Sequence, residues 1–123
     1  MLAGMSAPAP SPDCLFCKIV SGDIPAEIVH ADDSTVAFRD ISPQAPTHVL
    51  VVPRSHYPTA AELAQAEPTS VADLISAAAE IAEDEKLEDG YRLVFNTGPH
   101  AGQTIFHAHL HLLGGRPMVS LPT

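Results

Sequence analysis

The sequence predicts a single α+β domain, because three short strand-like segments precede one long amphipathic segment and two more strand-like segments follow it. The 123 residues suffice for one domain and are too few for two of ordinary size. Hydrophobic residues make up 46% of the chain, so a continuous core can form. This order of elements favours an antiparallel meander.

Residues 1–12 are rich in Ala, Pro and Ser, with no Lys or Arg and no apolar core, and so do not resemble a signal peptide. We expect a disordered leader over 1–12, a domain over 13–123 and a cytoplasmic location. No apolar run approaches the roughly 20 residues that a membrane helix needs. A short helix is predicted over 14–20, capped by Asp13 and ended near Gly22.

Three segments with strand character follow, at residues 27–30, 35–40 and 48–53. In the second, Val36 and Phe38 alternate with polar neighbours, which predicts a half-buried strand. The third is almost entirely apolar and should lie at the centre of the sheet.

Two helices and two strands complete the predicted domain. Thr59 and Glu62 have the spacing of a capping box and open a short helix. A longer helix runs to about Lys86. Its predicted apolar face comprises Val71, Leu74, Ile75, Ala78 and Ala82. The last two strands are expected over 91–96 and 105–113.

The chain is acidic, with fifteen acidic and six basic residues and a formal net charge of −9. This balance argues against a nucleic-acid surface, which needs a basic face to release counterions. A phosphate ligand would not be attracted by the overall charge. Any phosphate site must therefore be built locally, from backbone N–H groups and histidines.

Three histidines, His107, His109 and His111, stand two residues apart near the end of the chain. Alternate side chains of a strand share one face, roughly 6.5 to 7 Å apart, so three imidazoles should line one face. The opposite, buried face should hold Phe106, Ala108, Leu110 and Leu112. The pattern allows an ordinary polar strand face, one zinc held by all three rings, or a nucleophilic imidazole with phosphate-binding neighbours. The strict spacing argues against the first interpretation.

The loop before the histidines favours phosphoryl chemistry. It contains Asn96, Gly98 and the run Gly102-Gln103-Thr104. Glycine permits close approach of backbone N–H groups to phosphate oxygens. Such donors stabilise the oxyanion charge that develops at phosphorus.

Cys14-x-x-Cys17 also allows three interpretations. A thioredoxin-like redox pair would need a preceding strand, and none is predicted. A disulfide is disfavoured in the cytoplasm. Zinc needs two more ligands, which His56 and His107 can supply.

The segment from Gly102 to Arg116 is similar to the signature of the histidine triad (HIT) family, in which histidine alternates with apolar residues. Further matching motifs are Phe16-x-Lys18-Ile19, Ile24-Pro25-Ala26, the run from Phe38 to His48, and Val52-Pro53-x-x-His56. The resemblance covers residues 14–118. The Gly-Gly-Arg sequence after the third histidine favours the Hint-like purine nucleoside phosphoramidase branch.

The resemblance implies a HIT-like fold, a five-stranded antiparallel sheet with one main helix and short helices, in a homodimer that joins two sheets edge to edge. It also implies a purine nucleotide ligand. The implied reaction is hydrolysis of purine nucleoside 5′-phosphoramidates or aminoacyl adenylates through a nucleotidyl-histidine intermediate, releasing AMP or GMP. The alternatives are a dinucleoside polyphosphate hydrolase and a low-turnover nucleotide-binding or partner-binding sensor.

Residue by residue, the resemblance makes His109 the nucleophile, with His111, His48 and Thr104 as further catalytic groups. The implied nucleotide-binding residues are Leu15, Phe16, Ile19, Phe38, Asp40, Ile41, Asn96, Gly102, Gln103, Thr104, His109 and His111. Some bacterial members hold zinc with residues that match Cys14, Cys17, His56 and His107. Such a zinc would be structural, because four protein ligands leave no open position for water.

Overall fold

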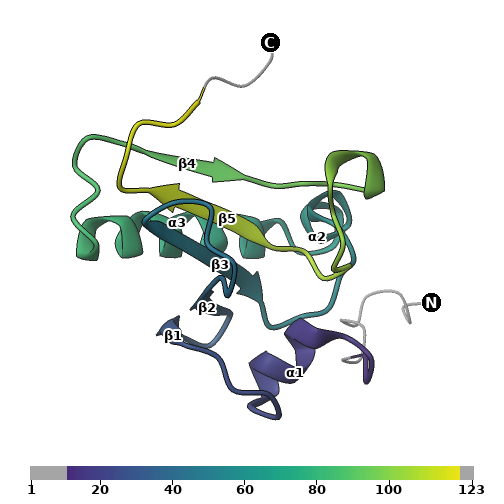
Figure 1. Cartoon of the computed structure of the whole chain (residues 1–123). Helices are drawn as coiled ribbons and strands as arrows, with labels where there is room; N and C mark the ends of the chain where they lie inside the picture. Colours follow the sequence, from purple (N-terminus) through teal and green to yellow (C-terminus); the bar gives the residue numbers. More distant parts are fainter. Residues whose placement is uncertain (1–10, 120–123) are drawn as a thin grey trace.

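The computed structural model describes residues 11–119, so the predicted leader lies outside the described residues except at positions 11 and 12. The elements, labelled in Figure 1, are α1 (Leu15–Ser21), β1 (Ile28–Ala31), β2 (Thr35–Arg39), β3 (Thr47–Pro53), α2 (Ala60–Ala66), α3 (Pro68–Asp84), β4 (Tyr91–Val94), a 3₁₀ turn (Pro99–Ala101) and β5 (Leu110–Gly114). Within this part of the chain no helix combines the length and apolar character needed to cross a membrane.

The five strands form one sheet in the order β1-β2-β3-β5-β4, and every neighbouring pair is antiparallel. The predicted α+β class and five-stranded antiparallel sheet are thereby confirmed. β3 is central, as predicted, and all seven of its residues are buried. β5 is the last strand in the sequence, yet it lies between β3 and β4 (Figure 1).

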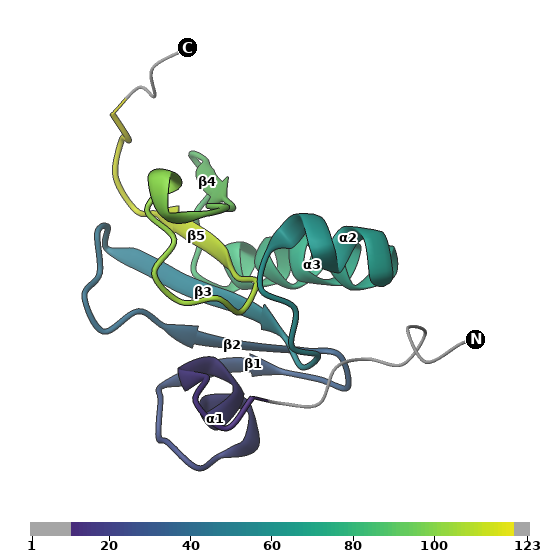
Figure 2. The ribbon, with the colours of Figure 1, turned by 90° about the vertical axis from the view of Figure 1, so that its right-hand side faces the viewer.

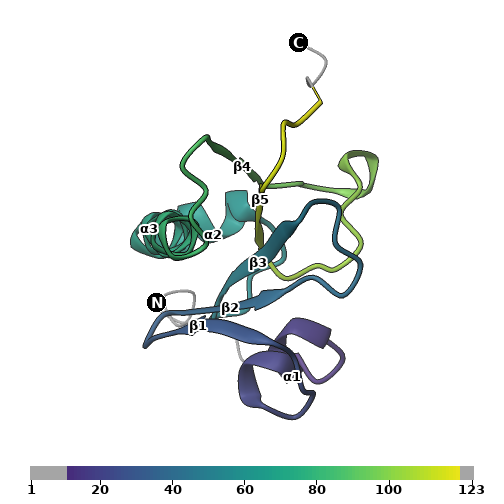
Figure 3. The same ribbon diagram turned by 60° about the vertical axis from the view of Figure 1, so that its left-hand side comes forward.

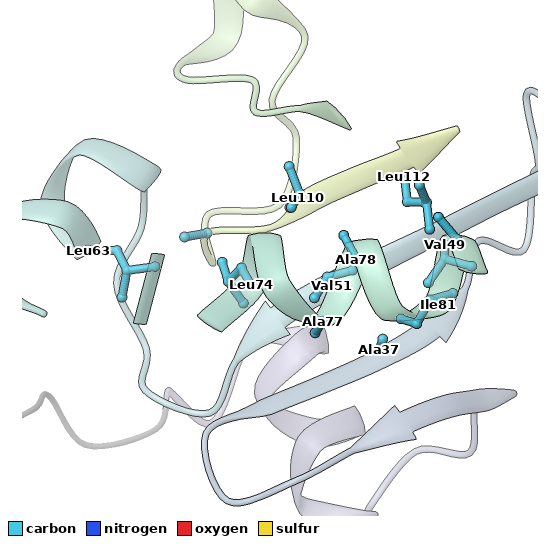
Figure 4. Packing of buried hydrophobic residues seen from close by; sticks show 12 residues of the cluster. Ala37, Val49, Val51, Leu63, Leu74, Ala77, Ala78, Ile81, Leu110 and Leu112 are labelled. Carbon is cyan, nitrogen blue, oxygen red and sulfur yellow. The ribbon is translucent and has the colours of Figure 1, made fainter. Parts of the chain in front are cut away.

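Helices cover both faces of the sheet: α2 and α3 pack on one face and α1 lies against the other (Figures 2 and 3). The face under α3 carries the larger apolar cluster (Figure 4). Its buried members are Ala37, Val49, Val51, Leu63, Leu74, Ala77, Ala78, Ile81, Ala82, Ala108, Leu110 and Leu112.

β2 is buried on both faces, so the prediction of a half-buried strand was wrong. Ala37 belongs to the cluster under α3, whereas Val36 and Phe38 pack against α1 on the opposite face. The covering by α1 could not be inferred from strand periodicity, which reports only one buried face.

The helix ends follow local capping. The thiol of Cys14 accepts a hydrogen bond from the Cys17 N–H at 3.2 Å and caps α1, so the predicted cap at the exposed Asp13 was wrong. Gly22 ends α1 with a φ of 86°, a left-handed conformation that glycine adopts without strain. The predicted cap of α2 at Thr59 is confirmed, since its hydroxyl oxygen accepts from the Glu62 N–H, whereas the Glu62 carboxylate accepts from the Thr59 hydroxyl and not from its backbone N–H. The long helix α3 ends at Asp84, slightly before the predicted end.

β5 begins at Leu110 and not at residue 105, so only the third histidine of the repeat lies in a regular strand. The backbone before it is diverted, because the Ala108 N–H donates to the Tyr57 carbonyl oxygen at 2.7 Å and not to β3. Phe106, predicted to be buried, is 44% exposed. The predicted alternation of faces holds for Leu110 and Leu112, which both join the core under α3.

Candidate active site and metal centre

A chain of ring contacts lies on the α1 face of the sheet, where β3 and β5 run side by side. His48 of β3 and His111 of β5 have ring centroids 5.2 Å apart, and those of His111 and His109 are 5.0 Å apart. Phe16 of α1 makes an edge contact with His109, at 5.0 Å between centroids. The structure therefore brings the predicted nucleophile together with both predicted histidine partners.

Hydrogen bonds determine which nitrogens of His48 and His111 carry protons. The backbone N–H of Gln44 donates to His48 Nδ1 at 3.0 Å, so the neutral ring carries its proton on Nε2. That Nε2 lies 3.0 Å from His111 Nδ1, to which it donates. The proton of a neutral His111 must then be on Nε2, which makes this nitrogen a hydrogen-bond donor.

The orientation of His109 leaves one ring nitrogen free for nucleophilic attack. Its Nδ1 lies 2.8 Å from the carbonyl oxygen of His107, an acceptor to which only a protonated Nδ1 can donate. In the neutral ring the lone pair is therefore on Nε2. A backbone carbonyl thus fixes both the tautomer and the direction of the imidazole.

Burial keeps these imidazoles neutral. Desolvation lowers the pKa of His48 and of His109 below the ordinary histidine value. Burial, with smaller contributions from the charges of His109 and His48, lowers the pKa of His111 to about 4. An uncharged imidazole is the form that acts as a nucleophile, so the site is prepared for attack near neutral pH.

Asp40, at the end of β2, lies beside this group of histidines. Its Oδ1 accepts from the Ser42 N–H at 2.7 Å, and its Oδ2 lies 3.5 Å from His48 Nε2. The carboxylate side chain is 20% exposed. A carboxylate offers about four lone-pair positions, so acceptor capacity remains for a ligand.

The predicted apolar residues are not equivalent. Phe16 and Phe38 are almost fully buried and meet edge to face, with centroids 5.4 Å apart. Ile19 is partly buried against the same cluster. Leu15 is 41% exposed and Ile41 is 97% exposed, so these two face outward at the rim.

The glycine-rich loop differs from the expected arrangement of free backbone donors. The N–H groups of Gly102 and Gln103 donate within the loop, to the carbonyl oxygens of Pro99 and Gly98. The buried Gln103 side chain accepts from Gly98 and donates to the Pro58 and Ile105 carbonyls. The loop is thus internally bonded.

Two other predicted loop residues remain accessible to a ligand. Thr104 is exposed and lines a cavity of about 410 Å³, together with Leu15, His56 and Phe106. Asn96, which follows β4, is partly buried.

Next to the histidine pair, four potential metal ligands converge: one atom each of Cys14, Cys17, His56 and His107 lies within 4.8 Å of all the others. Cys17 Sγ is 3.2 Å from His56 Nδ1. His107 Nδ1 is 3.4 Å from Cys14 Sγ and 3.5 Å from Cys17 Sγ. In a tetrahedral site with zinc bonds of about 2.0–2.3 Å, neighbouring ligand atoms are about 3.3–3.8 Å apart. The donor set and its spacing therefore fit zinc.

His107 is oriented for this role. It is fully buried, and its Nε2–H donates to the Pro53 carbonyl oxygen at 2.9 Å, which leaves the Nδ1 lone pair pointing at the sulfurs. Burial lowers the pKa of His107 to about 4, so the ring is neutral, as a ligand must be. Within residues 11–119, the ring nitrogens of the three histidines of the repeat do not converge as a group of potential ligands, so the rival arrangement with one metal on all three is not supported.

Comparison with known proteins agrees with this geometry. The family model described as the HIT domain matches residues 21–118. The chain belongs to the histidine triad family. The expected family and fold are thus confirmed, and the match includes all three histidines of the repeat as well as His48 and His56.

Relatives of this HIT-domain chain include enzymes and a metal-binding protein. It is 49% identical over 107 residues to the purine nucleoside phosphoramidase of Escherichia coli (strain K12). The aligned region covers 86% of this chain and 90% of that protein. It is 45% identical over 107 residues to a 14 kDa zinc-binding protein of Zea mays, with 85% and 83% covered. The solved HIT family hydrolase from Clostridium thermocellum superposes with a TM-score of 0.87 at 41% identity, covering 90% of this chain and 97% of that one.

Sequence patterns assigned no role to two residues that contact the histidine site or its neighbouring loop. Gln44 contacts His48 through its backbone N–H, which no side-chain pattern reports. Arg116, 72 positions later in the sequence, donates to the Gln44 carbonyl oxygen. Both lie within segments that resemble the family motifs, so only their contacts were missing.

Proposed function

We propose that this HIT-domain protein is a purine nucleoside phosphoramidase, which hydrolyses the bond between nitrogen and the α-phosphorus of a purine nucleotide. One observation carries the proposal: the His109 Nδ1–H is bonded to the His107 carbonyl, which leaves a lone pair on Nε2 in a ring that contacts the Nε2-protonated His111. The identity to the Escherichia coli phosphoramidase supports the choice of substrate.

In the first step, His109 Nε2 attacks the α-phosphorus and a nitrogen–phosphorus bond forms to the imidazole. The bond to the leaving amine breaks, and its electron pair takes up a proton. We assign that proton transfer to the exposed Thr104 hydroxyl, which is resupplied by solvent. The His111 Nε2–H donates to a phosphate oxygen as charge develops on it.

In the second step, water attacks the nucleotidyl-imidazole and gives one proton to the solvent, and His109 leaves with the electron pair of the nitrogen–phosphorus bond. The nucleoside monophosphate is released and the imidazole returns to its starting form. The low pKa values of His109 and His111 support this cycle, because both rings stay neutral between turnovers.

Binding of the nucleoside is assigned to the rim of the site. Asp40 accepts hydrogen bonds from the ribose hydroxyls, and Asn96 positions the ribose and phosphate. Phe16 and Phe38 form the floor beneath the purine, and the exposed Ile41 closes over it. The remaining residues assigned to the lining of the nucleotide site are Leu15, Ile19, Gly102 and Gln103.

A structural zinc is part of the proposal. Cys14, Cys17, His56 and His107 would hold it, and it would join α1 to the segments that precede α2 and β5. Bound there, it supplies structural stability and leaves the reaction to His109 and His111. The similarity to the zinc-binding protein of Zea mays supports this assignment.

We further propose that the protein is a homodimer that pairs two sheets through the β4 edge. In the described chain the two edge strands, β1 and β4, each have a strand neighbour on one side only, and an unpaired edge favours association. Tyr91 at the start of β4 is 42% exposed. Sedimentation equilibrium of the purified protein measures the mass of the assembly and would give a monomer mass if this edge stays free.

The reaction is tested with purified protein and four substrates: adenosine and guanosine 5′-phosphoramidate, an aminoacyl adenylate and a diadenosine polyphosphate. AMP or GMP release should be fastest from the phosphoramidates. Preferential cleavage of the diadenosine compound would indicate the dinucleotide hydrolase instead. AMP binding without release from any of the four would indicate a sensor.

A further inference from the structure

The loop over residues 41–46, between β2 and β3, has little packing of its own, although it contacts the histidine pair. Its positions from Ile41 to Gln44 are exposed, and so is Pro46. Only Ala45 is buried. The side-chain bonds of this segment are short-range: the Ser42 N–H donates to Asp40 Oδ1, and the Gln44 side chain donates to the Ser42 carbonyl oxygen.

A long-range anchor comes from the segment that follows β5. Arg116 Nη2 donates to the Gln44 carbonyl oxygen at 2.6 Å, a short charge-assisted bond across 72 positions of sequence. Its Nη1 donates to the Pro117 carbonyl oxygen at 3.1 Å, which fixes the guanidinium relative to its own backbone. One side chain thus ties the loop to the end of the last strand.

Gly115 allows this approach. Its φ is +98°, and a Cβ at this position would lie 2.8 Å from the Cβ of Pro46, in the same loop as Gln44. A larger residue would be strained by the backbone conformation and would push against the loop. The backbone after β5 therefore passes directly against the segment that Arg116 holds.

We propose that Arg116 is a positioning residue for catalysis: by holding the Gln44 backbone it keeps the Gln44 N–H on His48 Nδ1 and so fixes the tautomers of His48 and His111. The inference rests on the proposed function, because the importance of these tautomers is catalytic. It assigns a role to the last residue of the Gly114-Gly115-Arg116 motif.

The consequence of losing the anchor follows from proton counting. Without the Gln44 N–H, His48 is free to carry its proton on Nδ1, and its Nε2 then faces His111 Nδ1 as a second acceptor. The two nitrogens are 3.0 Å apart, so His111 must supply a proton at Nδ1 to keep the bond. Its Nε2 then has no proton to donate to a phosphate oxygen.

The first experiment compares Arg116→Ala with Arg92→Ala as the matched control. Arg92 also holds the C-terminal segment, through the Val119 carbonyl oxygen at 2.7 Å, but makes no hydrogen bond to the loop over 41–46. Two-bond proton–nitrogen spectra of ¹⁵N-labelled, ligand-free protein report the tautomer of each histidine. We expect Arg116→Ala to lose the uniform Nε2–H form of His48 and His111, and Arg92→Ala to retain it.

The kinetic readout on phosphoramidate should separate positioning from binding. For Arg116→Ala, kcat should fall by about tenfold while KM stays within about twofold, since only the phosphate-directed donor is affected. Wild-type tautomers together with wild-type kcat in Arg116→Ala would overturn the inference. The spectra require no substrate, so they test the tautomers independently of activity. A wild-type protein without phosphoramidase activity would therefore refute the proposed function and leave the effect of Arg116 on the tautomers to be judged from the spectra.

A second pair of variants acts on the loop itself. Gln44→Pro removes the N–H, whereas Gln44→Ala keeps it and removes only the side chain, which donates to the Ser42 carbonyl oxygen. Gln44→Pro should reproduce the tautomer change of Arg116→Ala, and Gln44→Ala should resemble the wild type. If Gln44→Pro keeps the wild-type tautomers of both histidines, the backbone donor does not set them and the inference fails.

Discussion

The Nδ1 atoms of His56 and His107 lie 3.2 Å apart, with the sulfur of Cys17 3.2 Å from the first and 3.5 Å from the second. The His107 Nδ1 lone pair points into this group of atoms, because its Nε2–H donates to the Pro53 carbonyl oxygen. A zinc ion bound by both rings and the two cysteine sulfurs would have a tetrahedral set of ligands.

Purified protein should therefore contain about one zinc per chain, and Cys14→Ser or Cys17→Ser should lose it. Chelation should lower the melting temperature, because the metal would close a loop of 90 residues between Cys17 and His107. Metal analysis by mass spectrometry and thermal melting check this. His100→Ala, on the exposed 3₁₀ turn, is the control that should keep its zinc. Full occupancy in Cys14→Ser would refute the assignment.

Replacing His109 tests the nucleophile. His109→Ala should lower kcat by at least about 1,000-fold, since no other nitrogen in the site has the same orientation. Its AMP affinity should stay within a few-fold of the wild type, because Asp40 and the aromatic floor are unchanged. Intact-mass spectrometry of a quenched wild-type reaction should show one added nucleotidyl group, and the variant none. Substantial turnover by the variant would exclude the mechanism.

Asp40→Ala should weaken ribonucleotide binding far more than binding of 2′-deoxy or 3′-deoxy analogues. Hydrogen bonds to a charged acceptor contribute about 1.5–3 kcal/mol, so a loss of roughly 10-fold to 150-fold in the affinity for AMP is expected. Calorimetric titration with each ligand measures the difference. Asp40→Asn separates charge from shape, and equal losses for all ligands would show that Asp40 acts only on His48.

The Arg39–Glu85 pair predicts a pH dependence of stability. Arg39 donates from Nη1 and Nη2 to the two carboxylate oxygens of Glu85, at 3.1 and 3.0 Å, and these bonds lower the pKa of Glu85 in the folded state. A lowered pKa stabilises the fold above the unfolded-state value of about 4.3, and this contribution disappears as the pH falls through the folded-state value.

Glu85→Gln should therefore lower the free energy of unfolding at pH 7 by about 1 kcal/mol, and this difference should shrink towards pH 3. Urea titrations at a series of pH values measure it. Glu83→Gln, an exposed change in α3 two residues before Glu85, should show no comparable trend. A constant difference at every pH would mean that the ion pair is not its origin.

Much of the fold could be predicted because local patterns agreed with the tertiary structure. The capping box at Thr59 and the apolar run over 48–53 each identified an element with small errors at its ends. The start of β5 could not be predicted, because the period-two pattern continues through residues 105–109. The strand does not extend back into these residues because the Ala108 N–H donates to the carbonyl oxygen of Tyr57, a residue distant in sequence.

The site was predictable where residue type alone carries the chemistry, as for His109 and the four potential metal ligands. It was not predictable where the backbone acts. The bond from Gln44 to His48 and the internal bonding of the Gly102–Gln103 loop depend on where main-chain groups point. The Arg39–Glu85 pair spans 46 positions, and no short-range pattern indicates it.

The position of β5 between β3 and β4 also determines when the protein can fold during its synthesis. β3 pairs with β2 and β5, whereas β4 pairs only with β5, which is synthesised after it. A nascent chain halted before Leu110 can pair β1, β2 and β3 but leaves β4 unattached. The ribosome must release the chain through β5 before the sheet closes, so this strand determines when the enzyme first exists.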